Sequence, residues 1–163
     1  MSAVLWFGLG VLGYTFIEYG HHRWGGHEKL MGQRILDSHR YHHRDPKEGG
    51  VSYPTKLAQR APLVIGVAGT LGAIFMLALG FRAGGLITAG LVSGYGYSEW
   101  FHHRMHHRPP KGVVARWMWK HHYVHHFVDP SVNYGFTSPL WDYVFFTRRD
   151  VDSVPVPEKF GPN

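Results

Sequence analysis

Histidine is the residue type whose number and spacing point most directly to chemistry. The chain of 163 residues contains 14 histidines and no cysteine. In a helix, side chains three or four residues apart share one face, so several of these imidazoles aim in the same direction. Imidazole is the commonest metal ligand of proteins, and so many buried rings without a metal would be left unpaired. The pattern therefore predicts a metal site without thiolate ligands. The histidines fall into four groups: His21, His22 and His27; His39, His42 and His43; His102, His103, His106 and His107; and His121, His122, His125 and His126.

Ten of these histidines form a regular set of ligand spacings. A structural zinc ion takes four ligands, so ten predict two metal ions. Two six-coordinate ions would leave two positions for water, oxygen or substrate, as a catalytic site needs. Imidazole suits iron, copper, nickel and zinc, so the ligand type alone does not select the metal. The other four, His21, His103, His107 and His121, could solvate the site or replace a neighbour. The ten are His22-x4-His27, His39-x2-His42-His43, His102-x3-His106 and His122-x2-His125-His126.

One pair in this set does not fit a regular helix. His22 and His27 are five residues apart, which would point them roughly 140° away from each other. We expect the Gly25-Gly26 pair to let the chain leave the helix after Trp24, so that His27 returns from a turn.

Two carboxylates are placed to orient ligating histidines. Such histidines usually donate their second ring N–H to a carboxylate or a carbonyl. Glu18 lies one turn before His22, and Glu99 lies three residues before His102. The alternative for both is a carboxylate at the membrane edge that pairs with a nearby arginine.

Three uncharged runs are the elements that must position the histidines. Residues 2–17, 61–81 and 83–98 carry no charged side chain, and Arg82 alone separates the last two. At about 1.5 Å per residue, the second run reaches roughly 30 Å, enough to cross a bilayer. The runs predict an all-α integral membrane protein with about three transmembrane helices and a histidine-rich helical cap, as a single domain over residues 1–163. Buried core helices of a soluble protein are the alternative.

The charges predict how such a protein would lie in the membrane. Three crossings place both polar blocks, residues 18–60 and 99–163, on one side, with 16 of the 17 basic residues and every histidine. Basic residues favour the cytoplasmic side, so we predict a multi-pass protein with cytoplasmic histidine clusters. The net charge of +6 is then explained by topology and anionic lipid headgroups, and no nucleic acid partner is expected. Gly90 and Gly94 have the spacing that lets membrane helices pack closely.

Taken together, the histidine motifs around membrane spans resemble those of the fatty acid hydroxylase and sterol desaturase superfamily of membrane di-iron oxygenases. The closest likeness is to fatty acid 2-hydroxylases, over roughly residues 14 to 147. It rests on Phe16-Ile17-Glu18-Tyr19 with His22-Arg23 and His27, and on Asn133-Tyr134-Gly135-Phe136 leading to Leu140-Trp141-Asp142-Tyr143-Val144-Phe145-Phe146-Thr147. Asp142, inside the second motif, is a further candidate for an orienting carboxylate.

The resemblance implies an oxidoreductase that hydroxylates a C–H bond of a fatty acyl or sterol-like lipid with O2. The ten histidines would bind two iron ions, which zinc could replace in the isolated protein. Such enzymes often carry further spans and a fused cytochrome b5 domain before the first motif, whereas the sequence starts one span before it. We therefore expect electrons to come from a separate donor resembling cytochrome b5 or ferredoxin.

Two alternatives stay open. The short gap between His27 and His39 resembles that of carotene hydroxylases of the same superfamily, which favours hydroxylation of a carotenoid ring. A non-catalytic membrane protein that binds metal is the other, because no acid–base residue stands out. Six aromatic residues could line a lipid channel, although anchoring at the membrane interface is the favoured role: Trp100, Phe101, Trp117, Trp119, Trp141 and Tyr143.

Overall fold

The computed structural model describes residues 2–47 and 53–160, and within these ranges every regular element is helical. This confirms the all-α prediction for the described part of the chain. A π-helix, η1, extends the first helix without a break. The elements are α1 (Ala3–Gly20), η1 (His21–His27), α2 (Gln33–Arg44), α3 (Tyr53–Leu79), α4 (Phe81–His107), α5 (Val113–Phe127), α6 (Leu140–Val144) and the 3-10 helix η2 (Glu158–Phe160).

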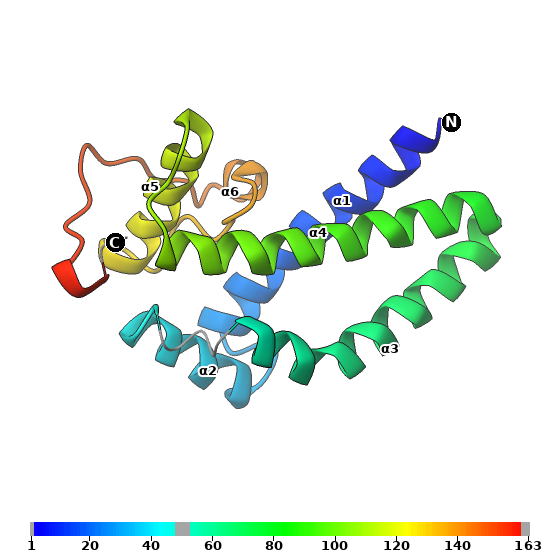
Figure 1. Ribbon diagram of the computed structural model, residues 1–163, viewed down its shortest axis with the longest axis horizontal. Coiled ribbons are helices and arrows are strands. Elements are labelled where there is room, and N and C mark those ends of the chain that lie inside the picture. The colour runs from blue at the N-terminus through cyan, green and yellow to red at the C-terminus, as the bar shows by residue number, and fades with distance from the viewer. Residues whose placement is uncertain (1, 48–52, 161–163) are drawn as a thin grey trace.

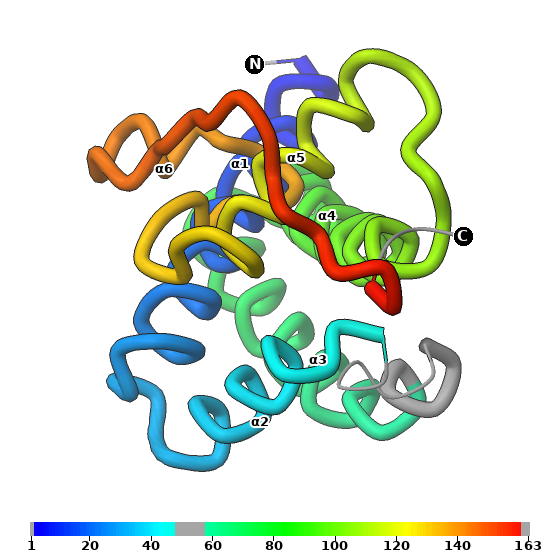
Figure 2. Tube along the Cα trace, turned by 90° about the vertical axis from the view of Figure 1, so that its left-hand side faces the viewer, coloured from blue at the N-terminus to red at the C-terminus, as the bar shows by residue number. Residues whose placement is uncertain are grey.

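The short helices lie at one end of three long helices, α1, α3 and α4 (Figure 1). The helices α3 and α4 form a hairpin that turns at Gly80, and α1 crosses α4 (Figure 1). The views in Figures 1 and 2 place α2 and α5 on opposite sides of the region where α1 and α4 end. The short helices therefore gather far from the hairpin tip, and all four histidine groups lie on helices that meet there.

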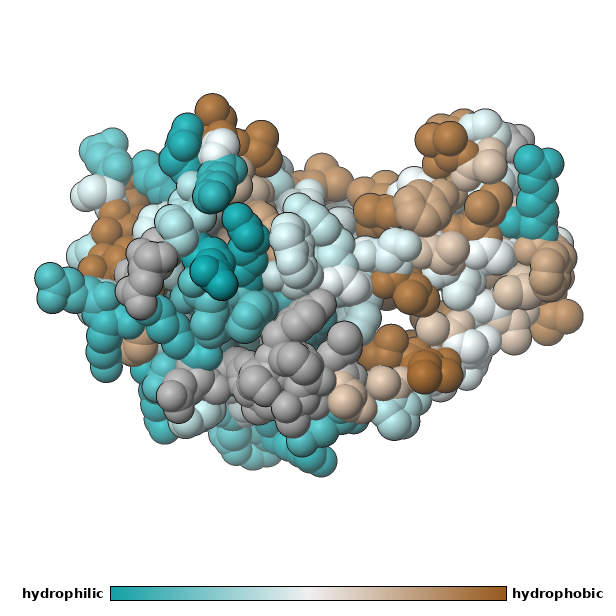
Figure 3. All heavy atoms as spheres, viewed as in Figure 1, coloured by the Kyte–Doolittle hydropathy of each residue, from teal (hydrophilic) through white to brown (hydrophobic). Residues whose placement is uncertain are grey.

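Two helices are long and apolar enough to cross a membrane: Ala3–His27, which joins α1 to η1, and Ala58–Leu79 within α3. Large apolar side chains stand out from both, including Val4, which is 79% exposed, and Leu77, which is 88% exposed. Such a surface is expected where lipid is the solvent. Figure 3 shows mostly apolar residues over the hairpin end, whereas most of the hydrophilic residues lie over the other end among some apolar ones. Residues 83–98 are helical within α4, and their crossing of the membrane stays a prediction.

The helices α1 and α4 touch backbone to backbone at two glycines. A Cβ atom on Gly10 would collide with the carbonyl oxygen of Ile87, and one on Gly90 would collide with the carbonyl oxygen of Phe7. One turn further along α4, Gly94 packs against α1 through the side chain of Tyr14, whose Cβ atom would lie 2.8 Å from a Cβ atom on this glycine. The sequence prediction of close helix packing at Gly90 and Gly94 is thus confirmed, because small residues at this spacing let helices approach.

Replacing Gly90 with alanine should lower the stability of the protein. The added methyl group overpacks the contact with α1, at a cost of about 1–3 kcal/mol. Gly96 on the same helix has no atom within 4 Å of the position of a Cβ, so Gly96→Ala should raise the stability slightly through helix propensity. Thermal unfolding of the two variants in detergent measures the difference, and equal midpoints would contradict the close contact.

Candidate metal centre

The structure brings the ten histidines selected from their spacing into two groups of five. In each group, the possible ligand atoms all lie within 4.8 Å of one another. The first group comprises His22 and His27 of η1, His39 and His43 of α2, and His125 of α5. The second group comprises His42 of α2, His102 and His106 of α4, and His122 and His126 of α5.

The helices α2 and α5 each supply both groups, and helix geometry explains how. His39 and His43 are four residues apart, so they share a face that points to the first group. Their neighbour His42 lies about 100° around the helix from His43 and points to the second group. The three candidate ligands among the histidines of α5 repeat this division, with His122 and His126 in the second group and His125 in the first. The two groups are therefore adjacent, because the same two helices run along both.

The π-helix η1 corrects the expectation for His22 and His27. The chain does not leave the helix after Trp24. It widens instead, so that hydrogen bonds join residues five apart, as from the N–H of Glu28 to the carbonyl of Arg23 at 3.0 Å. This repeat matches the spacing of the two histidines, whose ring centres lie 5.5 Å apart.

The glycine pair has another role than the expected turn. A Cβ atom on Gly26 would lie 2.8 Å from two ring atoms of His39, and one on Gly25 would lie 3.2 Å from a methyl carbon of Ile35. Both glycines therefore let α2 pack against η1, which brings the histidines of the two helices together.

The nitrogens in each group converge as ligands of one ion would. In the first group, five pairs of Nε2 atoms lie between 2.8 and 3.1 Å apart. In the second, two such pairs are separated by 3.0 and 3.2 Å. Neighbouring nitrogens on one octahedral ion, at a bond length of about 2.1 Å, would be about 3.0 Å apart. Both ring nitrogens of His126 are buried without a hydrogen-bond partner in the described structure. The donor set therefore fits a metal ion in each group.

Backbone carbonyls hold two rings of the first group in place. The Nδ1 atom of His22 lies within hydrogen-bonding distance of the carbonyl oxygen of Tyr134, and Nδ1 of His125 lies 2.7 Å from that of Val132. With Nδ1 as the donor, Nε2 of each ring is left without a proton and faces the group. Such outer contacts orient ligating histidines and set their tautomer.

Burial keeps the imidazoles in the neutral form that binds metal. It is the main cause that lowers the pKa of His43 to about 3, with a smaller effect of His27. Burial, followed by the charge of neighbouring histidines, also lowers the pKa of His106, His122 and His126 well below the usual value. At neutral pH these rings are therefore available as ligands, and no proton has to leave when a metal binds.

The structure gives Glu18 and Glu99 other partners than the expected histidines. The carboxylate of Glu18 accepts hydrogen bonds from the N–H groups of Phe136 and Thr137, at 3.1 and 3.0 Å, and from the Thr137 hydroxyl. It therefore anchors this turn, while the second ring nitrogen of His22 is taken by a carbonyl. Glu99 forms an ion pair of 2.8 Å with Arg60, which is the alternative role considered for it.

Asp142 is fully buried and holds the loop that follows α5. It accepts hydrogen bonds from the N–H groups of Tyr134 and the next residue, at 2.8 and 2.9 Å, and from the Thr147 hydroxyl at 2.8 Å. Its histidine partner is His121, at 3.1 Å, which lies outside both groups. Asp142 was expected to bind a ligating histidine directly. It instead holds the backbone of Tyr134, and the carbonyl of Tyr134 accepts from His22, so Asp142 orients this candidate ligand indirectly.

Asn133 is a positioning residue that the spacing of residues did not reveal. It is fully buried with a φ of 56°, a conformation that asparagine tolerates better than most residues. Its side chain donates to the carbonyls of His121 and Arg149, and accepts from the N–H of Arg149. It thereby ties α5 to the segment after α6. Only its place in the Asn-Tyr-Gly-Phe motif could have pointed to it.

The six aromatic residues considered for a channel divide between several roles. Trp100 and Phe101 line a cavity between α4 and α5. Trp141 donates to the hydroxyl of Thr15 on α1 at 2.9 Å and so joins α6 to the first span. Tyr143 is 53% exposed beside other apolar residues of α6, as an interfacial anchor would be. The remaining two, Trp117 and Trp119, stack on side chains of α5 itself, His121 and Tyr123.

Comparison with known proteins places this arrangement among fatty acid hydroxylases. The sequence model of a family described as fatty acid hydroxylase matches residues 7–147. The fatty acid 2-hydroxylase of Mus musculus is 32% identical over 160 residues, which cover 91% of this chain and 41% of that protein. The dihydroceramide fatty acyl 2-hydroxylase FAH2 of Arabidopsis thaliana is 31% identical over 144 residues, which cover 85% of this chain and 58% of that protein.

A solved structure supports the same relationship. The structure titled "Full length scs7p (only hydroxylase domain visible)" superimposes with a TM-score of 0.69 at 26% identity, and covers 93% of this chain and 58% of that one. The chain thus spans from two fifths to three fifths of the length of the relatives it matches.

Proposed function

The chain belongs to the fatty acid hydroxylase family, and from this premise we propose that it is a membrane-bound oxidoreductase that hydroxylates a C–H bond of a fatty acyl lipid with O2. The observation that carries the proposal is the pair of adjacent five-histidine groups, with nitrogens spaced as around an ion. Ten neutral imidazoles on four helices form a site far larger than one structural ion requires.

Each group would hold one metal ion, and iron is the ion that this reaction calls for. Bound iron would supply the activation of O2 and the redox change needed to break an unactivated C–H bond, whereas zinc in the same positions has no redox chemistry. The two electrons of each turnover would come from a separate donor protein of the cytochrome b5 or ferredoxin type.

The residues of the chain position the groups and keep water away from them. Phe136 stacks on His102 of the second group with ring centres 4.6 Å apart, and packs at 5.8 Å from His22 of the first. This ring covers both groups on one side, and Glu18 holds it there through the backbone. A dry, rigid shell of this kind protects reactive chemistry from water.

The proposed topology places the histidine groups at the cytoplasmic surface. In it α1, α3 and α4 cross the bilayer, and the hairpin tip at Arg82 faces the opposite side. The exposed apolar side chains of α1 and α3 support this arrangement, as does the gathering of basic residues in the blocks that carry the histidines. A lipid substrate would then reach the centre from the bilayer.

The test is formation of a hydroxylated lipid by the iron-loaded protein. Protein purified without oxygen is given iron, a chemical reductant and fatty acyl, sterol or carotenoid lipids, and the reaction is started with ¹⁸O₂. We expect one ¹⁸O atom in a fatty acyl product of the unchanged protein, and no labelled product from the His126→Ala variant. Label found only in a carotenoid or sterol would contradict the acyl substrate. Reversible metal exchange without oxygen consumption would indicate a metal-handling protein instead.

A further inference from the structure

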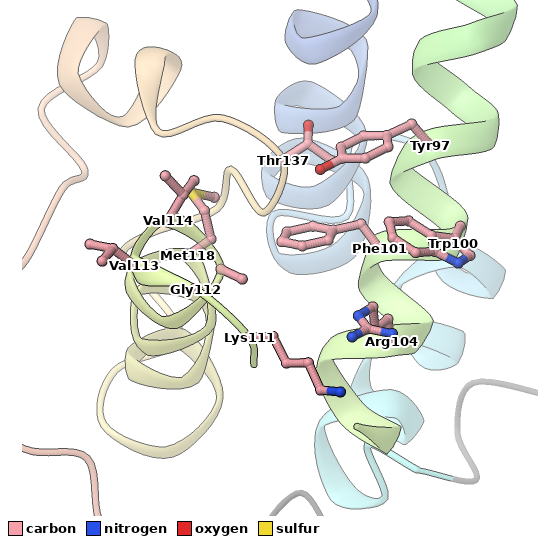
Figure 4. A pocket seen from close by; sticks show the side chains of 11 residues that line it. Tyr97, Trp100, Phe101, Arg104, Lys111, Gly112, Val113, Val114, Met118 and Thr137 are labelled. Carbon is pink, nitrogen blue, oxygen red and sulfur yellow. The ribbon is translucent and has the colours of Figure 1, made fainter. Parts of the chain in front are cut away.

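A cavity of about 450 Å³ lies between α4 and the start of α5, within the size range of small-molecule sites. Figure 4 shows its side chains converging from the two helices. Most of the wall is apolar and comes from Tyr97, Trp100 and Phe101 on α4, and from Val113 and Met118 on α5. A hydrocarbon chain would be in contact with such a wall along its length.

Two cations stand at one end of this cavity. In Figure 4, Arg104 on α4 and Lys111 before α5 are drawn toward the lower end of the cavity, and Tyr97 and Thr137 toward the upper end. No aspartate or glutamate lines the cavity, and neither cation forms an ion pair in the described part of the chain. The Arg104 guanidinium lies 5.7 Å from the ring centre of Trp100. The cations are therefore complementary to an anionic group that enters from outside the protein.

One aromatic residue separates this cavity from the histidines. Phe101 and Met118 line the cavity and belong to a buried cluster against which Phe136 packs. Phe136 also stacks on His102 of the second group and packs against His22 of the first. Arg104 follows His102 by two residues, which is about 3 Å along the helix axis. A group bound at Arg104 would therefore lie at about the level of His102 along α4, although the two side chains point about 200° apart around the helix.

We propose that this cavity binds a single-chain acyl lipid through an anionic head group, a carboxylate or a phosphate held by Arg104 and Lys111. The chain would run along Trp100, Phe101 and Met118 toward Tyr97. The inference rests on the proposed function in one respect, since it names the substrate class of the same centre. The binding itself requires neither metal nor turnover, so the two can be tested apart.

Quenching of tryptophan fluorescence by brominated lipids measures this binding. The zinc-loaded full chain, in bilayer discs of phosphatidylcholine, is titrated with brominated dodecanoate, dodecyl phosphate or dodecanol. We expect saturable quenching by the two anions and at least about tenfold weaker binding of the alcohol, because the charged hydrogen bonds are lost. Trp100→Phe should remove most of the saturable signal, since Trp100 lines the cavity.

Charge variants separate the head-group contact from the apolar wall. Arg104→Gln and Lys111→Gln should each weaken binding of the anions about tenfold and leave the alcohol unchanged. Arg116→Gln is the matched control, because Arg116 is an exposed cation of α5 outside the cavity. Equal affinity for acid and alcohol, or anion binding unaffected by both variants, would overturn the proposal.

Two further outcomes are decisive. Inorganic phosphate that competes as well as dodecyl phosphate would identify a site for free anions, and would overturn the lipid assignment. Saturable quenching that persists in Trp100→Phe would place the lipid elsewhere. Metal content is measured on these samples, and hydroxylation is measured on iron-loaded samples of the same proteins, because zinc has no redox chemistry. Anion binding without hydroxylation would contradict the proposed function alone, and hydroxylation without preference for an anion would contradict this inference alone.

Discussion

Replacing either His42 or His43 with alanine should remove one metal ion, and a different ion in each case, although the two residues are adjacent. His43 belongs to the first group and His42 to the second. Each variant should therefore keep the ion of the intact group, and metal content should fall by about half. Loss of either ion should lower hydroxylation more than about a hundredfold if the proposed reaction uses both ions. Elemental analysis of purified protein and product formation measure the two effects.

Double variants show that the lost ions differ. His42→Ala combined with His126→Ala affects the second group only, so this protein should still bind the first ion. His43→Ala combined with His126→Ala affects both groups and should bind neither. His107→Ala is the control, because His107 lies outside both groups. If either single variant lost all metal, or if the two double variants bound equal amounts, the division into two groups would be contradicted.

Replacing Asp142 with alanine should destabilise the fold and weaken the first group. The change leaves two buried N–H groups, the Thr147 hydroxyl and His121 without their acceptor. Leaving these buried groups without their charged partner should lower the free energy of unfolding by about 3–5 kcal/mol in total. The carbonyl of Tyr134 then no longer fixes His22, so metal affinity of the first group should fall about 10- to 100-fold. Unfolding in detergent and metal titration measure these two effects.

The matched control is Asp152→Ala, which removes an exposed carboxylate from the same part of the chain. It should change the free energy of unfolding by less than about 0.5 kcal/mol. Asp142→Asn keeps the shape of the side chain but replaces one acceptor oxygen with a donor. We expect an intermediate loss of stability. An Asp142→Ala protein that unfolds like the control would show that the loop is held by other contacts.

The local part of this architecture could be predicted from the sequence. A spacing of four residues on a regular helix predicts which histidines share a face, and the structure places His39 with His43 and His102 with His106 accordingly. The uncharged runs likewise predicted long helices. The expectation that a spacing of three residues also places histidines together was wrong here, because His39 and His42, and likewise His122 and His125, are divided between the two groups. The expectation that His22 and His27 would need a turn between them was wrong, because it assumed a regular α-helix. A π-helix has a different repeat, and the spacing of the residues does not reveal a π-helix.

The tertiary part could not be predicted, because it depends on partners far apart in the chain. Glu18 precedes His22 by one turn, yet it binds the turn at Phe136 and Thr137. The division of adjacent histidines between two groups depends on how α2 and α5 pack. The helix α4 packs against both α1 and α3, and within residues 83–98 it carries glycines and polar contacts, such as Ser98 with Tyr14, where α3 carries exposed apolar side chains.

Metal content and ligation of the intact protein test the central claim most directly. The protein is produced with ample iron and little zinc, purified without oxygen, and studied by elemental analysis and X-ray absorption at the metal edge. We predict two iron ions per chain, with about five imidazole nitrogens around each. A single ion or none per chain, or a coordination shell dominated by oxygen, would contradict the account.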